Sequence, residues 1–284
     1  MSVLITAARR AAILAILSGS ATARMVAQSP SWDAVDQAIG RAGSPQPGGV
    51  QKYSFPRSDL HVTAAGVSIK PALALGGWVA FKAVGGAKEV MAMGDLVLLE
   101  SEVAPVMSKL QSLGVEQTAL HNHLQHETPA VMYLHIRAHG DPVKIAQAVR
   151  EALALTKTPS RPPAPAAAGV FELDTARLAS TLGYPGKVTG GVYQVSVPRA
   201  DPIRMNGQEV PPAMGVATAI NFQPTGGGKA AITGDFVLTA DEVNLVIRAL
   251  RDGGVDVTAL HSHMLDEEPR LFFMHFWADD DALA

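Results

Sequence analysis

A long block of sequence occurs twice in this chain, and this repeat constrains the fold more than any other feature. Gly94–Asp141 contains GDLVLLESEV and TALHNHLQHETPAVMYLH, and Gly234–Asp281 contains GDFVLTADEV and TALHSHMLDEEPRLFFMH in the same places. The blocks align without a gap and share about 20 identical residues, far above chance for an internal repeat. Two units of one fold are therefore predicted. The polar pairs that both copies keep are His121/His261, His123/His263, Glu127/Glu267, His135/His275 and Asp141/Asp281.

The repeat extends beyond this block and sets the predicted domain boundaries. SFPRSD (Ser54–Asp59) matches SVPRAD (Ser196–Asp201), and the segment TPSRPPAPAAAG (158–169) has the Pro/Ala composition of a semi-rigid linker. We place repeat 1 at residues 31–157 and repeat 2 at 170–284. With 284 residues, of which 48% are hydrophobic, each repeat can bury a core of its own.

The first 27 residues belong to neither repeat and are typical of a secretory signal peptide. Arg9 and Arg10 precede the short apolar run Ala11–Leu17, and small residues follow at Ala21–Ala23 and at Ala27. A periplasmic or secreted protein is the main expectation, and a short N-terminal anchor or helix is the alternative. The apolar run is too short to span a bilayer, so no stable membrane insertion is expected after cleavage.

Composition narrows the classes of partner. The net charge is −3 and no basic patch stands out, which argues against a nucleic-acid partner. The absence of cysteine excludes disulfides and a lipobox, so any metal site must use nitrogen and oxygen ligands.

The hydrophobic patterns predict an α+β fold of two tandem repeats, with mainly antiparallel sheets and packed helices. Asp141 is expected to cap a helix, whereas Asp95 and Asp235, which follow glycines, are interpreted as turn residues. Expected helices are 32–41, 102–113, 143–155, 174–182 and 241–252. Expected strands are 51–55, 78–84, 90–99, 116–123 and 130–138 in repeat 1, and 191–197, 217–222 and 230–238 in repeat 2.

The repeated histidines form the strongest functional signal. Alternate residues of a strand share one face, so Val255, Val257, Ala259, His261 and His263 are expected on one inward face. The next strand adds a third histidine, and the turn between them adds a glutamate. We interpret this set as ligands of a divalent transition metal, with Zn, Mn, Fe, Cu and Ni not distinguished. The predicted ligands are His121, His123, Glu127 and His135 in repeat 1, and His261, His263, Glu267 and His275 in repeat 2.

Several interpretations of this cluster remain open at this stage. There is either one site in each repeat or one site shared between them. The histidines could instead be hydrogen-bonded core residues, or they could line a metal-free pocket for a small organic ligand. His126 aligns with Asp266 and could replace the neighbouring glutamate, although both are more simply turn residues. His61 and His139 have no histidine counterpart and are left out of the site.

A second repeated polar pair is Arg57 with Asp59, matched by Arg199 with Asp201. The simpler interpretation is a structural ion pair. The alternative is that Arg57 and Arg199 bind an anionic substrate, and that Asp59 and Asp201 orient ligand histidines from behind.

The blocks PRxD, GDLVLLESEV and TALHNHLQHETPAVMYLH resemble the LppY/LpqO family of bacterial envelope proteins, which carry a domain of unknown function. The resemblance covers both repeats and implies an envelope location, but no activity. The sequence therefore predicts an exported two-repeat metal-binding protein. Whether it is an enzyme is open; a metal-dependent hydrolase or lyase would use Glu127 or Glu267 as its base. The alternative is a non-enzymatic envelope protein that binds a small organic ligand without metal.

Overall fold

The computed structural model describes residues 32–85, 88–161 and 170–284. The predicted signal peptide and most of the predicted linker lie outside these residues. No helix within them is long and apolar enough to cross a membrane.

Each repeat contains one six-stranded antiparallel sheet, which confirms the predicted α+β class. In repeat 1 the strand order is β1-β2-β5-β6-β9-β7, and in repeat 2 the equivalent order is β10-β11-β14-β15-β18-β16. The first sheet consists of β1 (Ser44–Gln46), β2 (Val50–Pro56), β5 (Gly76–Val84), β6 (Glu89–Leu99), β9 (Val131–Gly140) and β7 (Glu116–His121). The second consists of β10 (Gly186–Thr189), β11 (Val192–Pro198), β14 (Ala217–Gly226), β15 (Lys229–Leu238), β18 (Phe272–Asp281) and β16 (Asp256–His261).

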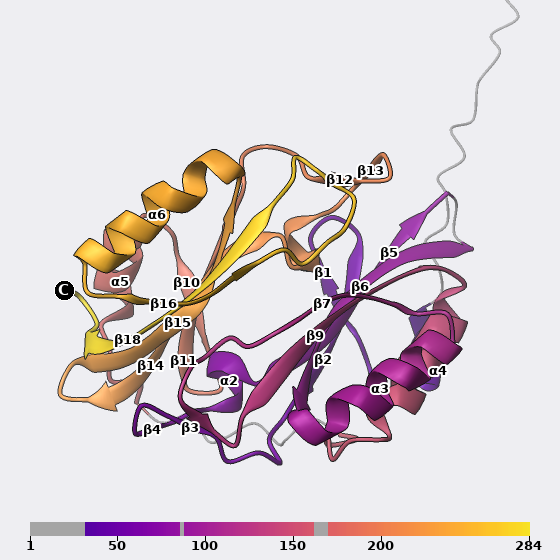
Figure 1. Ribbon diagram of the computed structural model, residues 1–284, viewed down its shortest axis with the longest axis horizontal. Coiled ribbons are helices and arrows are strands. Elements are labelled where there is room, and N and C mark those ends of the chain that lie inside the picture. Colours follow the sequence, from indigo (N-terminus) through magenta and orange to yellow (C-terminus); the bar gives the residue numbers. More distant parts are fainter. Residues whose placement is uncertain (1–31, 86–87, 162–169) are drawn as a thin grey trace, which may run out of the picture.

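The longer helices cover the outer faces of the sheets, whereas the short α2 (Pro71–Ala74) and the 3-10 turn η1 (Pro212–Met214) lie at the interface between the repeats (Figure 1). The other helices of repeat 1 are α1 (Trp32–Ile39), α3 (Glu100–Ser112) and α4 (Pro142–Leu153); those of repeat 2 are α5 (Thr175–Leu182) and α6 (Ala240–Asp252). Val35, Leu110 and Val149 from three helices pack on the first sheet. As predicted, the Asp141 carboxylate caps α4 by accepting hydrogen bonds from the Val143 and Lys144 N–H groups.

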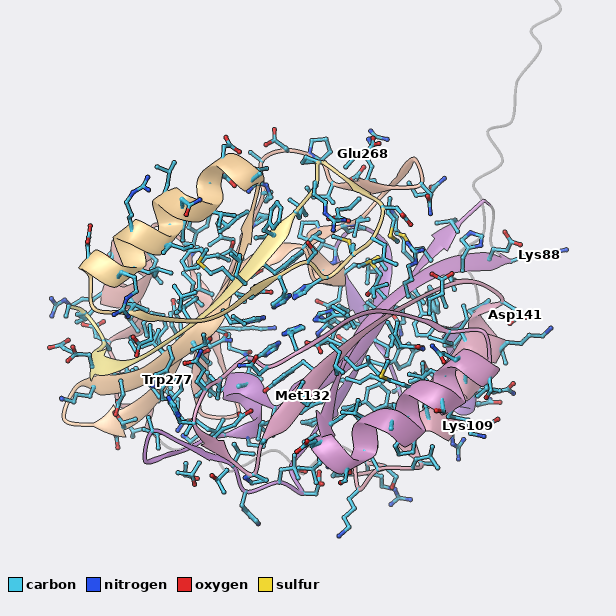
Figure 2. The ribbon with its side chains drawn as sticks, viewed as in Figure 1. Lys88, Lys109, Met132, Asp141, Glu268 and Trp277 are labelled. Carbon is cyan, nitrogen blue, oxygen red and sulfur yellow. The ribbon has the colours of Figure 1, made fainter. Side chains whose placement is uncertain are left out.

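The two sheets face each other, so the inner layer of the molecule is the interface between the repeats (Figure 1). Side chains from both sheets fill this layer, while Lys109 lies on the outer helices (Figure 2). Two apolar clusters hold the repeats together. One joins Met93 of repeat 1 to Met264 and Phe273 of repeat 2, and the other joins Tyr133 to Val192. The repeats therefore share a buried core.

Each repeat also reaches across with a small three-stranded sheet that the sequence patterns did not predict. Repeat 1 forms β4-β3-β8 and repeat 2 forms β13-β12-β17. Their strands have two residues each, which is too short for a periodic signal. They are β3 (Thr63–Ala64), β4 (Val67–Ser68), β8 (Glu127–Thr128), β12 (Arg204–Met205), β13 (Gln208–Glu209) and β17 (Glu267–Glu268).

Equivalent residues of the two repeats form equivalent hydrogen bonds across the interface. Lys52 Nζ donates to the Ala213 carbonyl at 3.2 Å, and Gln194 Nε2 donates to the Ala72 carbonyl at 2.9 Å. Both bonds run from the second strand of one sheet to the short helical turn of the other repeat. The two repeats are thus related by an approximate two-fold arrangement, with equivalent residues meeting at its centre.

Candidate metal centre

The strands bring three histidines of each repeat to the inner face. His135 lies on β9 opposite Asp95 of β6, and His275 lies on β18 opposite Asp235 of β15. His121 and His261 end β7 and β16. His123 and His263 follow two residues later, and their rings stack on Tyr133 and Phe273 at centroid distances of 3.3 and 3.6 Å. The aromatic rings hold these two imidazoles in place.

A β-bulge in the edge strand of each repeat breaks the alternation of inward and outward side chains that the sequence predicted. The register shifts between Gln117 and Ala119 in β7, and between Val257 and Ala259 in β16. As a result, Val257 packs with the helix layer of repeat 2, while Ala259 lies opposite His275 on the inner sheet face. The expectation that Val257 and His261 share one face was therefore wrong, because the bulge exchanges the faces.

The six histidines form one cluster at the centre of the interface. The rings of His121 and His261 stack at 3.6 Å between centroids. The other close ring contacts between the repeats join residues at unlike positions of the duplication. The ring centroids of His123 and His275 lie 3.9 Å apart, and those of His135 and His263 lie 3.7 Å apart. Ligand atoms of His121, His261, His263 and His275 lie within 4.8 Å of one another, as do those of His121, His123 and His135. His121 belongs to both groups, so the two predicted sites adjoin.

Two aspartates complete this cluster, and the sequence interpretation of them was wrong. Asp95 and Asp235 lie within β6 and β15 rather than in turns. Asp95 lies 3.9 Å from His123 Nε2 and 3.8 Å from His135 Nε2, and Asp235 lies 3.8 Å from His263 Nε2 and 3.9 Å from His275 Nε2. These gaps exceed hydrogen-bonding distance.

The glycine before each aspartate has a steric role. A Cβ at Gly94 would lie 2.8 Å from the Trp78 carbonyl oxygen, and one at Gly234 would lie 1.9 Å from that of Ala219. Only glycine therefore allows the neighbouring strand to approach at this position. This explains why both copies keep the glycine.

The polar atoms facing the centre are buried and lack hydrogen-bond partners. This holds for Nε2 of all six histidines and for one oxygen each of Asp95 and Asp235. His275 Nδ1 contacts the Gly234 carbonyl at 2.9 Å, and His121 Nδ1 contacts the Asn122 carbonyl at 3.1 Å. A carbonyl can only accept, so both Nδ1 atoms carry the hydrogen and both Nε2 lone pairs are free. Each buried atom left unpaired costs about 1–3 kcal/mol.

Burial also sets the protonation states. It lowers the pKa of His121 to about 4, and burial with the nearby His121 charge lowers that of His261 to about 3. Burial lowers the pKa of the other four histidines well below the usual value. Burial raises the pKa of Asp95 to about 7, and burial together with the Asp95 charge raises that of Asp235. Neutral imidazoles therefore face the centre at neutral pH.

These shifts predict how the stability of the metal-free protein depends on pH. Below the usual histidine pKa of 6.5 the unfolded chain binds protons that the folded cluster excludes. The free energy of unfolding therefore decreases as the pH is lowered from 6.5 to about 4. The raised pKa values of the acids act in the opposite direction, because the folded acids hold protons up to about pH 7. The histidine contribution to the free energy of unfolding dominates, because six histidines and only two aspartates of the centre have shifted pKa values. Urea unfolding of metal-free protein should therefore show a net loss of stability on acidification, at about 1.4 kcal/mol per pH unit for each excess proton. A stability that is constant over this window would contradict the buried, neutral histidines.

The predicted ligands Glu127 and Glu267 begin the two-residue strands β8 and β17, and each accepts a hydrogen bond from a backbone N–H four residues further along. Glu127 Oε1 accepts from the Val131 N–H, and Glu267 Oε1 accepts from the Leu271 N–H, both at 3.0 Å. Glu267 also pairs with Arg270 at 3.3 Å. The second oxygen of Glu127 is buried without a partner, and burial raises the pKa of this carboxyl to about 7. Neither glutamate belongs to the two groups of closely spaced ligand atoms.

Arg57 forms the predicted structural ion pair and has no donor left for a substrate. Its guanidinium is buried and bonds to Asp59, to Glu102 at 2.6 Å and to the Val97 carbonyl at 2.8 Å. Glu102 in turn accepts from the Leu99 N–H at the start of α3. The network therefore anchors this helix to the sheet.

Arg199 repeats the network in a more open form. It pairs with Glu242 at 2.7 Å and with the exposed Asp201 at 3.7 Å. His61, His126 and His139 lie outside both ligand groups, and Asp266 pairs with Arg137.

A large cleft opens beside the centre, between the inner faces of the two sheets. Its volume is about 1500 Å³, and its walls come from β1, β2, β5 and β6 of repeat 1 and from β10, β11, β14 and β15 of repeat 2. Asp95, Asp235 and four of the histidines line it: His123, His135, His263 and His275. A ligand in the cleft can thus reach the cluster.

The duplicated architecture matches one family. The family described as Domain of Unknown Function (DUF1259) matches residues 33–155 and 176–284, which are the two repeats. The chain belongs to this family. Family membership confirms a two-copy domain and assigns no activity to it.

Other comparisons add little. No curated protein matches the chain. Among solved structures, the trimeric bacterial microcompartment shell protein PduB is 14% identical, with 84% of this chain and 85% of that chain covered and a TM-score of 0.19. EtuB from Clostridium kluyveri is 10% identical, with 85% of each chain covered and a TM-score of 0.18. Likeness at this level supports no conclusion about function.

Proposed function

We propose that this protein binds divalent transition metal ions in a single centre shared by its two repeats. The carrying observation is the convergence of six buried imidazole Nε2 atoms and two carboxylate oxygens without hydrogen-bond partners. A packed core avoids such groups, because apolar residues of similar size would be more stable. A metal ion satisfies lone pairs of this kind, and neutral imidazole is the form that binds it.

The donor set supports two adjacent ions. Each repeat supplies three imidazoles and one carboxylate, which is enough for a four-coordinate shell. Asp95 completes the set of repeat 1, and Asp235 completes that of repeat 2. Nitrogen and carboxylate donors without thiolate suit Zn, Mn, Fe, Cu or Ni.

The adjoining cleft favours a working centre over a purely structural one. Structural metal sites have closed shells, whereas sites that bind or activate a second ligand remain accessible. The proposed function is therefore metal-dependent chemistry of the hydrolase or lyase class, or metal-assisted capture of a small molecule, in the cleft between the sheets. The N-terminal pattern and the resemblance to LppY/LpqO proteins support a periplasmic or secreted location.

Elemental analysis of mature protein purified without chelator or tag tests the proposal. We expect about two equivalents of one transition metal, since each repeat carries a complete donor set. Loading should also raise the melting temperature, because an ion that binds only the folded state stabilises it by about 4 kcal/mol at a thousandfold excess over Kd. Protein that remains metal-free after reconstitution with each candidate ion would overturn the proposal and favour a metal-free pocket.

A further inference from the structure

The two halves of the cleft differ, and the difference lies in one row of residues across each sheet. In repeat 1 this row runs Ser54, Trp78, Asp95, His135. In repeat 2 the equivalent row runs Ser196, Ala219, Asp235, His275. Only the second position differs, and it changes from the largest side chain to one of the smallest. The two repeats therefore have the same residues at the centre but a different residue in the cleft beside it.

Trp78 lines the repeat 1 half of the cleft. Its ring reaches the residue that follows η1 of repeat 2, because a Cβ at Gly215 would come within 2.8 Å of it. The Lys52 ammonium lies 4.0 Å from the ring centroid. The equivalent positions in repeat 2 hold Ala219 and the neutral Gln194, so this half is left wider beside Asp235.

Two ammonium groups that form no salt bridge among the described residues line this cleft. Lys52 is half-buried and Lys187 is exposed on β10, and neither forms a salt bridge. Burial lowers the pKa of Lys52 to about 8, while Asp95 raises it and the Lys187 charge lowers it further. The two positive charges are thus close enough to repel each other. The third cleft lysine, Lys70, donates to the Gly191 carbonyl at 3.1 Å, as Lys52 does to the Ala213 carbonyl at 3.2 Å; an ammonium group has three hydrogens, so these bonds leave donors for a ligand.

We propose that the cleft binds a small anion whose carboxylate or phosphate group lies between Lys52 and Lys187, with the rest of the molecule in the wider half beside Ala219 and Asp235. An anion there would relieve the repulsion between the two ammonium groups. Its other end would face the buried aspartates and histidines, which places the reacting or recognised group at the metal. This last point names a ligand class for the proposed metal centre and rests on that proposal; the lysine site does not.

Isothermal titration calorimetry with succinate and with inorganic phosphate tests the site, on both metal-free and Zn²⁺-loaded protein. The two probes separate carboxylate from phosphate recognition. The decisive variant is Lys52→Gln with Lys187→Gln. Gln194 already occupies the Lys52 position in repeat 2 and makes the equivalent bond across the interface, so glutamine is compatible with the fold. We expect the affinity for at least one probe to fall about tenfold or more, because two charge-assisted contacts are lost.

Lys82→Gln is the matched control. Lys82 also crosses the interface, by donating to the Glu209 carbonyl at 2.6 Å, and its repeat 2 counterpart is Gln223. It does not line the cleft, so its loss should leave the affinity unchanged. Ala219→Trp, which copies the repeat 1 residue into the wider half, should weaken binding in a chain whose circular dichroism is unaltered.

The outcomes separate the two proposals. Lysine-dependent binding in protein that takes up no metal would support the anion site and overturn the metal centre. Metal uptake with equal probe affinity in wild type and the double lysine variant would do the reverse. No heat of binding from either probe at millimolar concentration, with or without Zn²⁺, would overturn the anion site.

Discussion

Replacing His121 and His261 together by alanine should abolish stoichiometric metal binding and leave a folded protein. These two rings form the stacked pair at the middle of the cluster, and His121 belongs to both groups of closely spaced ligand atoms. Their loss therefore reduces the donor set of both repeats at once. Loss of such ligands costs more than the 10–100-fold in affinity that is typical of residues supporting them. Elemental analysis after dialysis, with circular dichroism to verify folding, measures the effect.

The same variant also gives a prediction for the stability of the metal-free protein. Removing buried imidazoles whose Nε2 atoms have no partner relieves a desolvation cost, which offsets much of the packing lost with the rings. The metal-free variant should accordingly be about as stable as metal-free wild type. In the presence of metal, wild type should be clearly more stable than the variant. If the variant unfolded readily and wild type never bound metal, the histidines would be core residues.

His61→Ala with His139→Ala is the matched control for this experiment. Both histidines are exposed and lie outside the cluster. Their replacement should leave metal content and stability unchanged. Equal metal loss in the control would indicate adventitious surface binding rather than a built centre.

The histidine cluster was predictable from sequence because the duplication marked its members. A single copy would not have distinguished His135 from the other polar residues of its strand, Arg137 and His139, whereas two copies singled out His135 and His275 together. The merging of the two sites was left open, because it depends on how the sheets pack. No local pattern specifies that packing, since the contacts join residues about 140 positions apart.

Two features were missed for local physical reasons. Gly-Asp is a common turn pair, so Asp95 and Asp235 were interpreted as turn residues. The structure instead requires the glycine for the close approach of a neighbouring strand, and each aspartate points to the centre. The bulges in β7 and β16 were also missed, because a one-residue insertion leaves the apolar pattern intact while exchanging the faces.

Arg57→Ala should destabilise the fold strongly, and its repeat counterpart Arg199→Ala should do so only weakly. Arg57 is 1% exposed and satisfies the carboxylates of Asp59 and Glu102. Its removal leaves the buried Glu102 and the half-buried Asp59 without this partner, and a loss of about 3–5 kcal/mol is typical when one partner of a buried ion pair is removed. Glu102 also bonds the Leu99 N–H at the start of α3, so the end of that helix should loosen as well.

The Arg199 network has the same connectivity but is open to solvent. The side chains of Glu242 and Asp201 are 37% and 70% exposed, so water can solvate both acids once the guanidinium is gone. The expected loss is therefore about 1 kcal/mol or less. Urea unfolding of the two variants in parallel measures the difference, and metal content should be unchanged in both, because neither arginine contacts the cluster. Equal losses of stability would show that burial is not what makes the Arg57 network costly to break. A loss of metal in folded Arg57→Ala protein would instead tie this arginine to the centre.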